Sequence, residues 1–332
     1  MTVKVLEAGP LATVQDLGRK GYAIQGFREC GACDKYAMQL ANILAGNPRN
    51  AAVLECTLAG GKYQFEKETV IALTGAITRP KVDGQEVPMF ASVYIKSGQV
   101  LEIPVALQGL RVYLAVHGGI DVPLVMGSRS TDVRCRMGGY EGRALQKGDL
   151  LPVGEGRLTF VKAVKDGKGC PGIGEAELWM RKADYSFRSV GKDLVPVLRA
   201  VPGPQDEFFS EKGKDTFVRA VYKVGSDSDR MASRLEGSVL ENVRGLDILS
   251  DGIVEGSVQI SSGGQPMVML ADHQTTGGYA KIATVISTDI PAIAQKRPGE
   301  KIAFAFVTAE EAICAARRQE RRLAWFEEKW RL

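Results

Sequence analysis

The sequence is poor in histidine: its 332 residues include only His117 and His273. Two isolated histidines exclude a mechanism that depends on a histidine cluster, and the six cysteines form no spaced Cys/His set of the kind that holds zinc. The GxxxxGK[ST] nucleotide loop, the HExxH helix and the GxSxG elbow are also missing. We therefore expect no metal site, and neither a self-contained ATPase nor a zinc hydrolase.

Long apolar runs and a large excess of one charge are missing as well. No stretch approaches the roughly 20 apolar residues of a membrane span, and the N-terminal segment lacks the apolar core of a signal peptide. We therefore expect a cytoplasmic protein without a membrane partner. Lys and Arg number 43 against 39 Asp and Glu, a net charge of +4, and this margin predicts no nucleic-acid surface.

The spacing of the cysteines gives little evidence for a redox or metal site. Cys30 and Cys33 form a lone CxxC, with no second CxxC and no βαβ pattern around it. In a reducing compartment free thiols are more common than disulfides. A structural role is favoured over a redox or metal role.

Short β-branched or alternating runs, separated by Gly, Pro, Asn or Asp, dominate the chain. Such runs are typical of sandwiches and barrels, so we expect a mostly β protein with few helices. The expected strands are 69–77, 91–98, 100–105, 111–120, 156–161, 196–203, 217–224, 256–264, 266–271 and 301–307.

Three segments predict helices. Residues 34–46 place apolar side chains on one stripe after Asp34, a plausible N-cap. Residues 287–295 predict a helical turn. Near the C-terminus, Thr308 and Glu311 match a capping box before a run of helix formers.

A Lys- and Gly-rich stretch, 162–176, is the best linker candidate in the chain. It divides the sequence into two halves of similar length, each with an acid near a Gly-rich strand that leads into a polar loop. This faint repetition favours two similar β domains. We predict an N-terminal domain over 1–165 and a C-terminal domain with a C-terminal helix over 166–332.

Three loops carry more Gly and polar groups than a turn needs. In residues 13–22, Gln15 and Asp16 precede two glycines, a combination suited to a side-chain-capped turn. His117 and Gly118 end an apolar strand, where the glycine permits either a tight turn or close approach of a ligand. In 200–208 a rigid Pro-Gly-Pro bend presents Gln205, which suits recognition of a planar amide but also an ordinary turn.

The densest polar stretch is ADHQTTGGYAKIATV, residues 271–285. Its acid, hydroxyls and paired glycines can orient a small carbonyl compound and stabilise an oxyanion through backbone N–H groups. A purely structural loop rarely needs all of these groups together, so we favour a functional role. The segment of interest contains Asp272, His273, Gln274, Thr275, Thr276, Gly277, Gly278 and Tyr279.

Two further segments flank that stretch in the sequence. Arg230 and Arg234 share a face if 226–237 is helical, and can then hold a carboxylate or phosphate. They can equally belong to an ordinary surface cluster with neighbouring acids. Gln265, in SSGGQP, is a further polar candidate.

These segments resemble, in order, the biotin-dependent carboxyltransferase family. The family includes the C subunit of 5-oxoprolinase, the antagonist of the sporulation kinase inhibitor, and the allophanate hydrolase subunit 2 type domain. The similarity extends from residue 7 to about residue 307. It is carried by GPLATVQDLGRKGY, GACDKYAMQLANILAGNP, AVLECTLAGG, GGIDVPLVMGSRSTD, VPGPQDEF, SDRMASRLEG and GQPMVMLADHQTTGGYAKIATVISTDIPAIAQKRPGE.

The resemblance implies two cyclophilin-like β-barrel domains and ATP-dependent opening of 5-oxoproline to glutamate. The implied partners are the B subunit, of the kinase-inhibitor or allophanate hydrolase subunit 1 type, and the LamB/YcsF-like A subunit, with the ATP site shared among them. One alternative is transfer of a carboxyl group from carboxybiotin, on a separate carrier, to a small amide or urea-like acceptor. Another is a non-catalytic antagonist that binds a kinase-inhibitor protein.

Within this hypothesis the polar stretch and the loop at His117 line a shared cleft for a small amide or lactam. Members usually have arginine at the position of His273, so this chain loses a permanent charge there. The catalytic candidates are Asp272, Thr275, Thr276, Gly277 and Gly278. The substrate-binding candidates are His117, Gly118, Gln205, Arg230, Gln265, His273, Gln274 and Tyr279.

Overall fold

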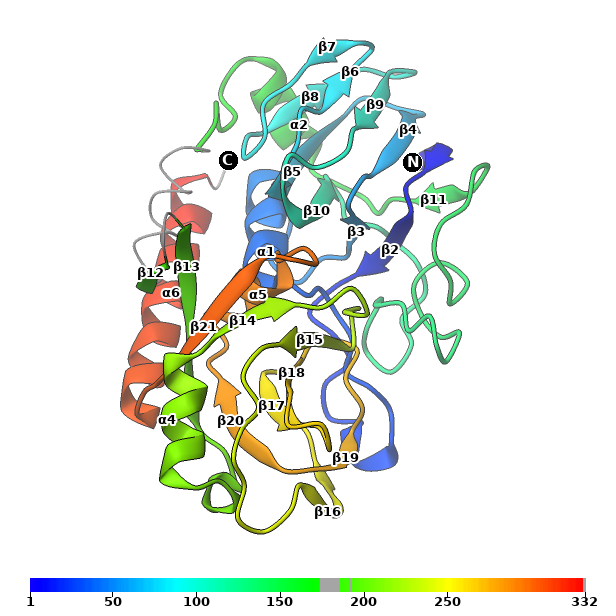
Figure 1. Ribbon diagram of the computed structural model, residues 1–332. Coiled ribbons are helices and arrows are strands. Elements are labelled where there is room, and N and C mark those ends of the chain that lie inside the picture. The colour runs from blue at the N-terminus through cyan, green and yellow to red at the C-terminus, as the bar shows by residue number, and fades with distance from the viewer. Residues whose placement is uncertain (174–185, 191–192, 331–332) are drawn as a thin grey trace. The chain divides into compact units, whose positions relative to one another are not determined.

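The computed structural model describes residues 1–173, 186–190 and 193–330 (Figure 1). The chain forms two compact units and enters each more than once. The first unit contains Met1–Lys20, Cys30–Leu178 and Arg321–Leu332, and the second contains Gly21–Glu29 and Trp179–Glu320. The division into 1–165 and 166–332 stays a prediction, because no single boundary separates these segments.

Two sheets build the first unit, and their neighbouring strands pair antiparallel. One sheet has the order β11 (Leu150–Pro152), β1 (Thr2–Ala8), β4 (Gly61–Phe65), β9 (Val100–Ile103), β6 (Lys81–Val82) and β7 (Gln85–Glu86). The other has the order β2 (Leu11–Gln15), β3 (Val53–Thr57), β10 (Gln108–Val116), β5 (Thr69–Ile77) and β8 (Val93–Ile95).

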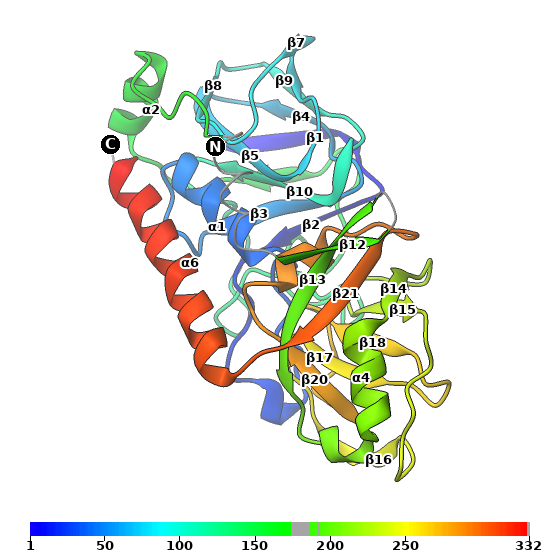
Figure 2. The same ribbon diagram turned by 60° about the vertical axis from the view of Figure 1, so that its left-hand side comes forward.

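One apolar core lies between these sheets. Val5 and Tyr63 contribute from one sheet, and Leu73 and Leu114 from the other, all fully buried. In β1 and β4 buried residues alternate with more exposed ones, as the period of a strand requires when one face is buried, whereas β5 and β10 are buried at consecutive positions. The helix α1 (Lys35–Leu44) packs against β5 and β10 (Figure 2). Its predicted cap is confirmed, since the Asp34 carboxylate accepts a hydrogen bond from the Ala37 amide at 2.8 Å.

A closed ring of strands builds the second unit. Starting at β13, each strand pairs with the next, and a parallel pairing of β13 with β21 closes the ring. Closure leaves no unpaired edge within the ring. The order is β13 (Asp193–Pro202), β20 (Lys281–Val285), β17 (Ser257–Ile260), β18 (Pro266–Met269), β15 (Ala232–Glu236), β14 (Val221–Val224) and β21 (Lys301–Phe306), with β12 (Ser186–Val190) added beside β13.

The ring is filled by apolar side chains that include Val258, Ile282 and Phe304. Helix α4 (Glu211–Arg219) contacts β21, and its Phe217 stacks on Phe304 with ring centroids 4.4 Å apart (Figure 2). A separate ribbon of β16 (Asp247–Gly252) and β19 (Thr276–Tyr279) projects from this unit. This ribbon carries the polar stretch singled out in the sequence.

The predicted helices near the C-terminus are confirmed. The turn at 287–295 contains α5 (Ile290–Ala294), and α6 (Ala309–Lys329) begins with the predicted capping box. Thr308 donates its amide hydrogen to a Glu311 carboxylate oxygen at 2.8 Å, and the Thr308 hydroxyl accepts from the Glu311 amide at 3.2 Å. No helix among the described residues is both long and apolar enough to cross a membrane.

The mostly β fold is confirmed, but one predicted strand is wrong and a second is wrong over its first residues. Residues 156–161 enter helix α2 (Leu158–Lys165), because Phe160, Val161 and Val164 lie on one helical face and form a small core with Val70. Residues 217–224 are divided between the end of α4 and the strand β14. Short apolar runs fit a helix and a strand equally well, so their period alone does not decide.

Candidate functional site

Arg230 and Asp272 form a bidentate ion pair in the second unit. The Arg230 Nε and Nη2 atoms each donate to one oxygen of Asp272 at 2.9 Å. The side chains are 7% and 13% exposed, so the pair is held largely out of water. Arg234, expected on the same helical face, instead lies in strand β15 and pairs with Asp227 at 3.1 Å. Both oxygens of Asp272 are therefore already engaged by the guanidinium.

The residues after Asp272 make a turn and then join strand β19. His273 is buried, and its Nδ1 lies 2.7 Å from the carbonyl oxygen of Gln274, whose side chain is exposed. Thr275 accepts a backbone hydrogen bond from Ile253, and Thr276 is exposed and pairs with Gly252.

The two glycines of this stretch lie in an extended, paired strand. Gly277 is opposite Asp251, and a Cβ atom there would come within 2.5 Å of Ile253 and 2.7 Å of the Gln259 amide nitrogen. At Gly278 the nearest atom to an added Cβ would be 3.4 Å away, so the packing is looser. Gly277 thus leaves room for the side chains of Ile253 and Gln259, while its backbone takes part in a β-ladder.

Gln205, Asp251 and Lys281 form a polar network beside this glycine. The Lys281 Nζ lies 2.8 Å from an Asp251 carboxylate oxygen, and the Gln205 amide donates to the same oxygen at 3.3 Å. The Gln205 carbonyl accepts from the Lys281 backbone amide at 3.2 Å. Lys281 is only 3% exposed, whereas Asp251 is 52% exposed. The hydrogen bond from Lys281 is the main cause that lowers the pKa of Asp251 below its usual value.

The other two candidates of this unit have local structural contacts. Gln265 accepts from the Gly237 amide at 2.9 Å and donates to the Gly237 carbonyl at 3.0 Å. Tyr279 is half-buried against Met267 and its neighbours, and its backbone carbonyl accepts from Gln259 at 3.4 Å. The Tyr279 contacts connect the ribbon to the ring of strands, whereas the Gln265 contacts lie at the ends of β15 and β18 within the ring.

In the first unit, His117 and Gly118 are held by backbone groups and an amide. The His117 ring places Nδ1 at 2.7 Å from the Ala45 carbonyl and Nε2 at 3.2 Å from the Arg157 carbonyl, and it stacks on Phe160. Burial is the main cause that lowers the pKa of His117. The Gly118 amide donates to the Asn47 side chain at 2.8 Å.

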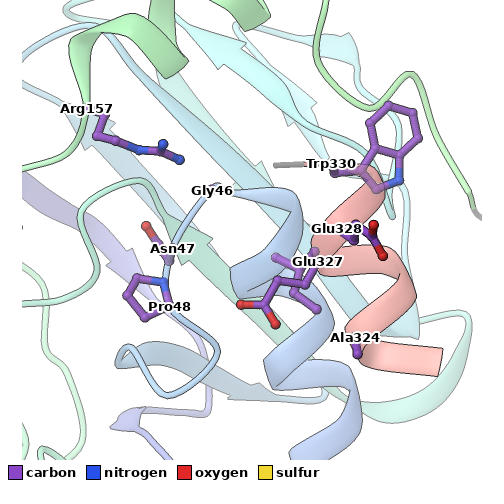
Figure 3. Close-up of a pocket in the computed structure, with 9 residues that line it drawn as sticks. Gly46, Asn47, Pro48, Arg157, Ala324, Glu327, Glu328 and Trp330 are labelled. Atoms are coloured by element: carbon purple, nitrogen blue, oxygen red, sulfur yellow. The ribbon is translucent and has the colours of Figure 1, made fainter. Parts of the chain in front are cut away.

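A pocket of about 730 Å³ lies beside this loop (Figure 3). Its lining includes Arg157, whose carbonyl contacts His117, and Asn47, which holds Gly118. The end of α6 supplies further polar side chains, among them Glu327, which pairs with Arg49 at 3.1 Å. His117 is not among the residues that line this pocket, and both of its ring nitrogens face carbonyl oxygens.

The structure brings two groups of predicted residues together and adds two that were not predicted. Arg230 joins Asp272, and Gln205 joins the Gly277 strand through Asp251 and Lys281. The sequence offered a reason to select Lys281, because it is a charged residue at the start of an apolar strand. Asp251 had none, because it lies in a polar segment that resembles many surface loops. Among the described residues, no group of three or more His, Cys, Asp or Glu side chains is arranged to hold a metal ion.

The chain is similar over nearly its whole length to curated bacterial proteins. It is 39% identical to the C subunit of 5-oxoprolinase from Escherichia coli (strain K12), over 97% of this chain and 98% of that protein. It is 36% identical to the C subunit of 5-oxoprolinase from Haemophilus influenzae, over 96% and 95% of the two chains.

The fold is also present in a larger solved structure. The Kluyveromyces lactis urea carboxylase matches 100% of this chain with a TM-score of 0.86 and 28% identity, and this chain spans 30% of that one. The family model described as carboxyltransferase domain, subdomain A and B, matches residues 25–306. The chain belongs to this carboxyltransferase domain family.

Proposed function

We propose that this chain is the C subunit of an ATP-dependent 5-oxoprolinase, which opens 5-oxoproline to glutamate together with its A and B subunits. The observation that carries the proposal is the alignment with the C subunit of the Escherichia coli enzyme, which spans 97% of this chain and 98% of the relative. The match to urea carboxylase spans only 30% of that larger protein. Similarity along nearly all of both chains favours the shared role of a separate subunit.

The second unit supplies groups that suit a lactam. A lactam presents one carbonyl acceptor and one N–H donor, and Lys281 and Asp251 offer the complementary donor and acceptor 2.8 Å apart. Lys281 is buried, which strengthens its field on an oxygen that gains negative charge. We assign Lys281 to stabilise the developing oxyanion and Asp251 to hold the ring nitrogen.

The candidates named from the sequence take more specific roles in this proposal. Thr275, Thr276, Gly277 and Gly278 form the wall that faces the lactam, because Gly277 is paired with Asp251. Asp272 acts as a positioning residue, since both of its oxygens bind Arg230. The sequence has no GxxxxGK[ST] loop, so the ATP site is completed by the partner proteins.

The test is ATP-dependent release of glutamate from 5-oxoproline by the three co-expressed proteins. We expect Lys281→Met to lower kcat by about 10²-fold, as removal of one oxyanion donor does in other enzymes. Lys301→Met is the matched control, because Lys301 forms an exposed ion pair with Asp193 at 2.9 Å. It should retain full activity. Glutamate release that does not require this chain would refute the proposed function.

A second candidate is transfer of a carboxyl group to a small amide or urea-like acceptor, favoured by the urea carboxylase match at a TM-score of 0.86. No MKM biotinylation sequence occurs in the chain, so the biotin would be carried by another protein. Incubation with a carrier whose carboxybiotin bears a labelled carboxyl group tests this function. Label in the acceptor, without glutamate release from 5-oxoproline, would favour carboxyl transfer.

A further inference from the structure

Arg19 is a buried cation in the first unit, and no described carboxylate pairs with it. Its side chain is 1% exposed, and within the described part of the chain its hydrogen bond runs from Nη2 to the Ser130 carbonyl. The Nε and Nη1 atoms are buried without a hydrogen-bond partner among the described residues. A guanidinium stays charged in proteins, so its burial is unfavourable unless an anion accompanies it.

The nearby carboxylate of Asp16 is used elsewhere. One of its oxygens accepts from the Ser128 hydroxyl at 2.7 Å and the Ser130 hydroxyl at 2.5 Å. The other accepts from the Arg129 amide at 2.6 Å. Asp16 therefore orders the loop 128–130 and fixes the Ser130 carbonyl that Arg19 contacts, without pairing with Arg19 itself.

The backbone around the guanidinium is built for close approach. A Cβ atom at Gly138 would lie 2.7 Å from Arg19 Nη2 and 2.3 Å from the Ser130 carbonyl oxygen, and Gly138 has a φ of +66°. Only glycine fits this position. Arg19 lies in a segment without helix or strand, between Gly18 and Gly21, which both have positive φ.

We propose that Arg19 is the receptor for the carboxylate of a small molecule, which reaches the guanidinium when the segment between Gly18 and Gly21 opens. A carboxylate supplies the negative charge and the oxygen acceptors that Nε and Nη1 lack. The choice of 5-oxoproline as its source rests on the proposed function. The requirement for an anion rests on Arg19 alone, and bicarbonate is the other small source of the same group.

The first test measures the melting temperature of the isolated full chain with added ligand. A ligand that binds only the folded state raises the melting temperature. We expect 5-oxoproline to raise the melting temperature more than 2-pyrrolidinone, the same lactam without the carboxylate, at equal concentration. Arg19→Met should abolish this difference. Arg143→Met is the control that should keep it, because Arg143 is already paired with Asp149.

The outcomes separate the sources of the carboxylate. An Arg19-dependent response to bicarbonate but not to 5-oxoproline would support the receptor and assign it to the carboxyl-transfer function. An equal response to 2-pyrrolidinone, an equal response in Arg19→Met, or no response to either anion would overturn the proposal. This readout needs no catalysis, so it stays interpretable if the co-expressed proteins release no glutamate.

A second test uses the ligand-free chain. If Arg19 is an anion receptor, its charge is uncompensated in the ligand-free chain. Replacing it with Met removes that charge, so the Arg19→Met variant should have a melting temperature equal to or above that of the wild type. A melting temperature below that of Arg143→Met would identify a structural brace and overturn the proposal. Should Arg19→Met not fold, Arg19→Lys decides. It keeps the charge but loses the planar fork, so the half-saturating anion concentration should rise at least tenfold, and an unchanged value would overturn the proposal.

Discussion

Two buried arginines, Arg19 in the first unit and Arg230 in the second, are compensated differently. In the second unit, Arg230 pairs with Asp272 and Lys281 pairs with Asp251, so each of these buried cations has its own carboxylate. In the first unit, Asp16 is surrounded by neutral hydroxyl and amide donors, and Arg19 donates a hydrogen bond to the Ser130 carbonyl without a carboxylate among the described residues. The second unit therefore balances these charges by itself, whereas the first holds a cation that an external anion can complete.

Among the substitutions that test this comparison, Asp272→Ala should cause the largest loss of unfolding free energy. The substitution leaves the Arg230 guanidinium, 7% exposed, without its bidentate carboxylate. Breaking a buried pair from one side costs about 3–5 kcal/mol of unfolding free energy. Denaturant unfolding measures this loss. The control is Asp193→Ala, which breaks an exposed ion pair and should cost little unfolding free energy. An equal loss in the two variants would contradict the claim that the buried Arg230 depends on its carboxylate.

Asp16→Asn should have the next largest effect. Its carboxylate accepts from the Ser128 hydroxyl, the Ser130 hydroxyl and the Arg129 amide, and an amide group would bring a donor against one of these donors. We expect a loss of about 2 kcal/mol in unfolding free energy. Asp83→Asn is the matched control, since Asp83 accepts from neutral donors at an exposed position and should lose less.

Lys281→Met tests the pairing of Lys281 with Asp251 through the pH dependence of stability. Lys281 lowers the folded-state pKa of Asp251 below the usual 3.8, so the ionised carboxylate stabilises the fold above that value. This stability is lost as the pH falls through the lowered pKa. In Lys281→Met the Asp251 pKa should rise toward 3.8, and the acid-dependent part of the melting temperature should shrink. Carboxyl NMR titration measures the Asp251 pKa. An unchanged pKa in Lys281→Met would show that Lys281 does not cause the shift.

His117→Gln should give the smallest effect. Burial lowers the folded-state pKa of His117 below the usual 6.5, so the unfolded chain binds its proton first as the pH falls. Stability should therefore decrease as the pH drops below about 6.5, and His117→Gln should lose that slope. Melting temperatures across this range measure it. His273→Gln is the control, and it also assigns the two histidine resonances, since the chain has no third histidine.

Local signals predicted the elements that local chemistry decides. Asp34 was identified as the cap of α1, and the Thr308–Glu311 capping box marked the start of α6, because each motif satisfies backbone amides within a few residues. The strand prediction for 217–224 failed at its first residues. There Ser210 caps α4 by accepting from the Gly213 amide at 3.0 Å, a signal that lies outside the apolar run.

The candidate site was predicted only in part. The stretch 271–285 was identified, but Lys281 within it was passed over in favour of the hydroxyls and glycines. Asp251 reaches Lys281 from strand β16, 30 residues away in sequence, and Gln205 comes from 76 residues away. No spacing rule connects residues at such separations, because their approach depends on the ring of strands.

The sequence by itself determined the strand-rich fold class, the capped helices and the family, because these follow from side-chain periodicity and from motifs that stay in order along the chain. The tertiary structure alone decided which charges meet. In the folded chain Asp272 pairs with Arg230 and Asp251 pairs with Lys281, whereas Arg19 pairs with no described carboxylate. Coulomb attraction and desolvation act through space, so the compensation of a buried charge is settled only when distant strands are packed together.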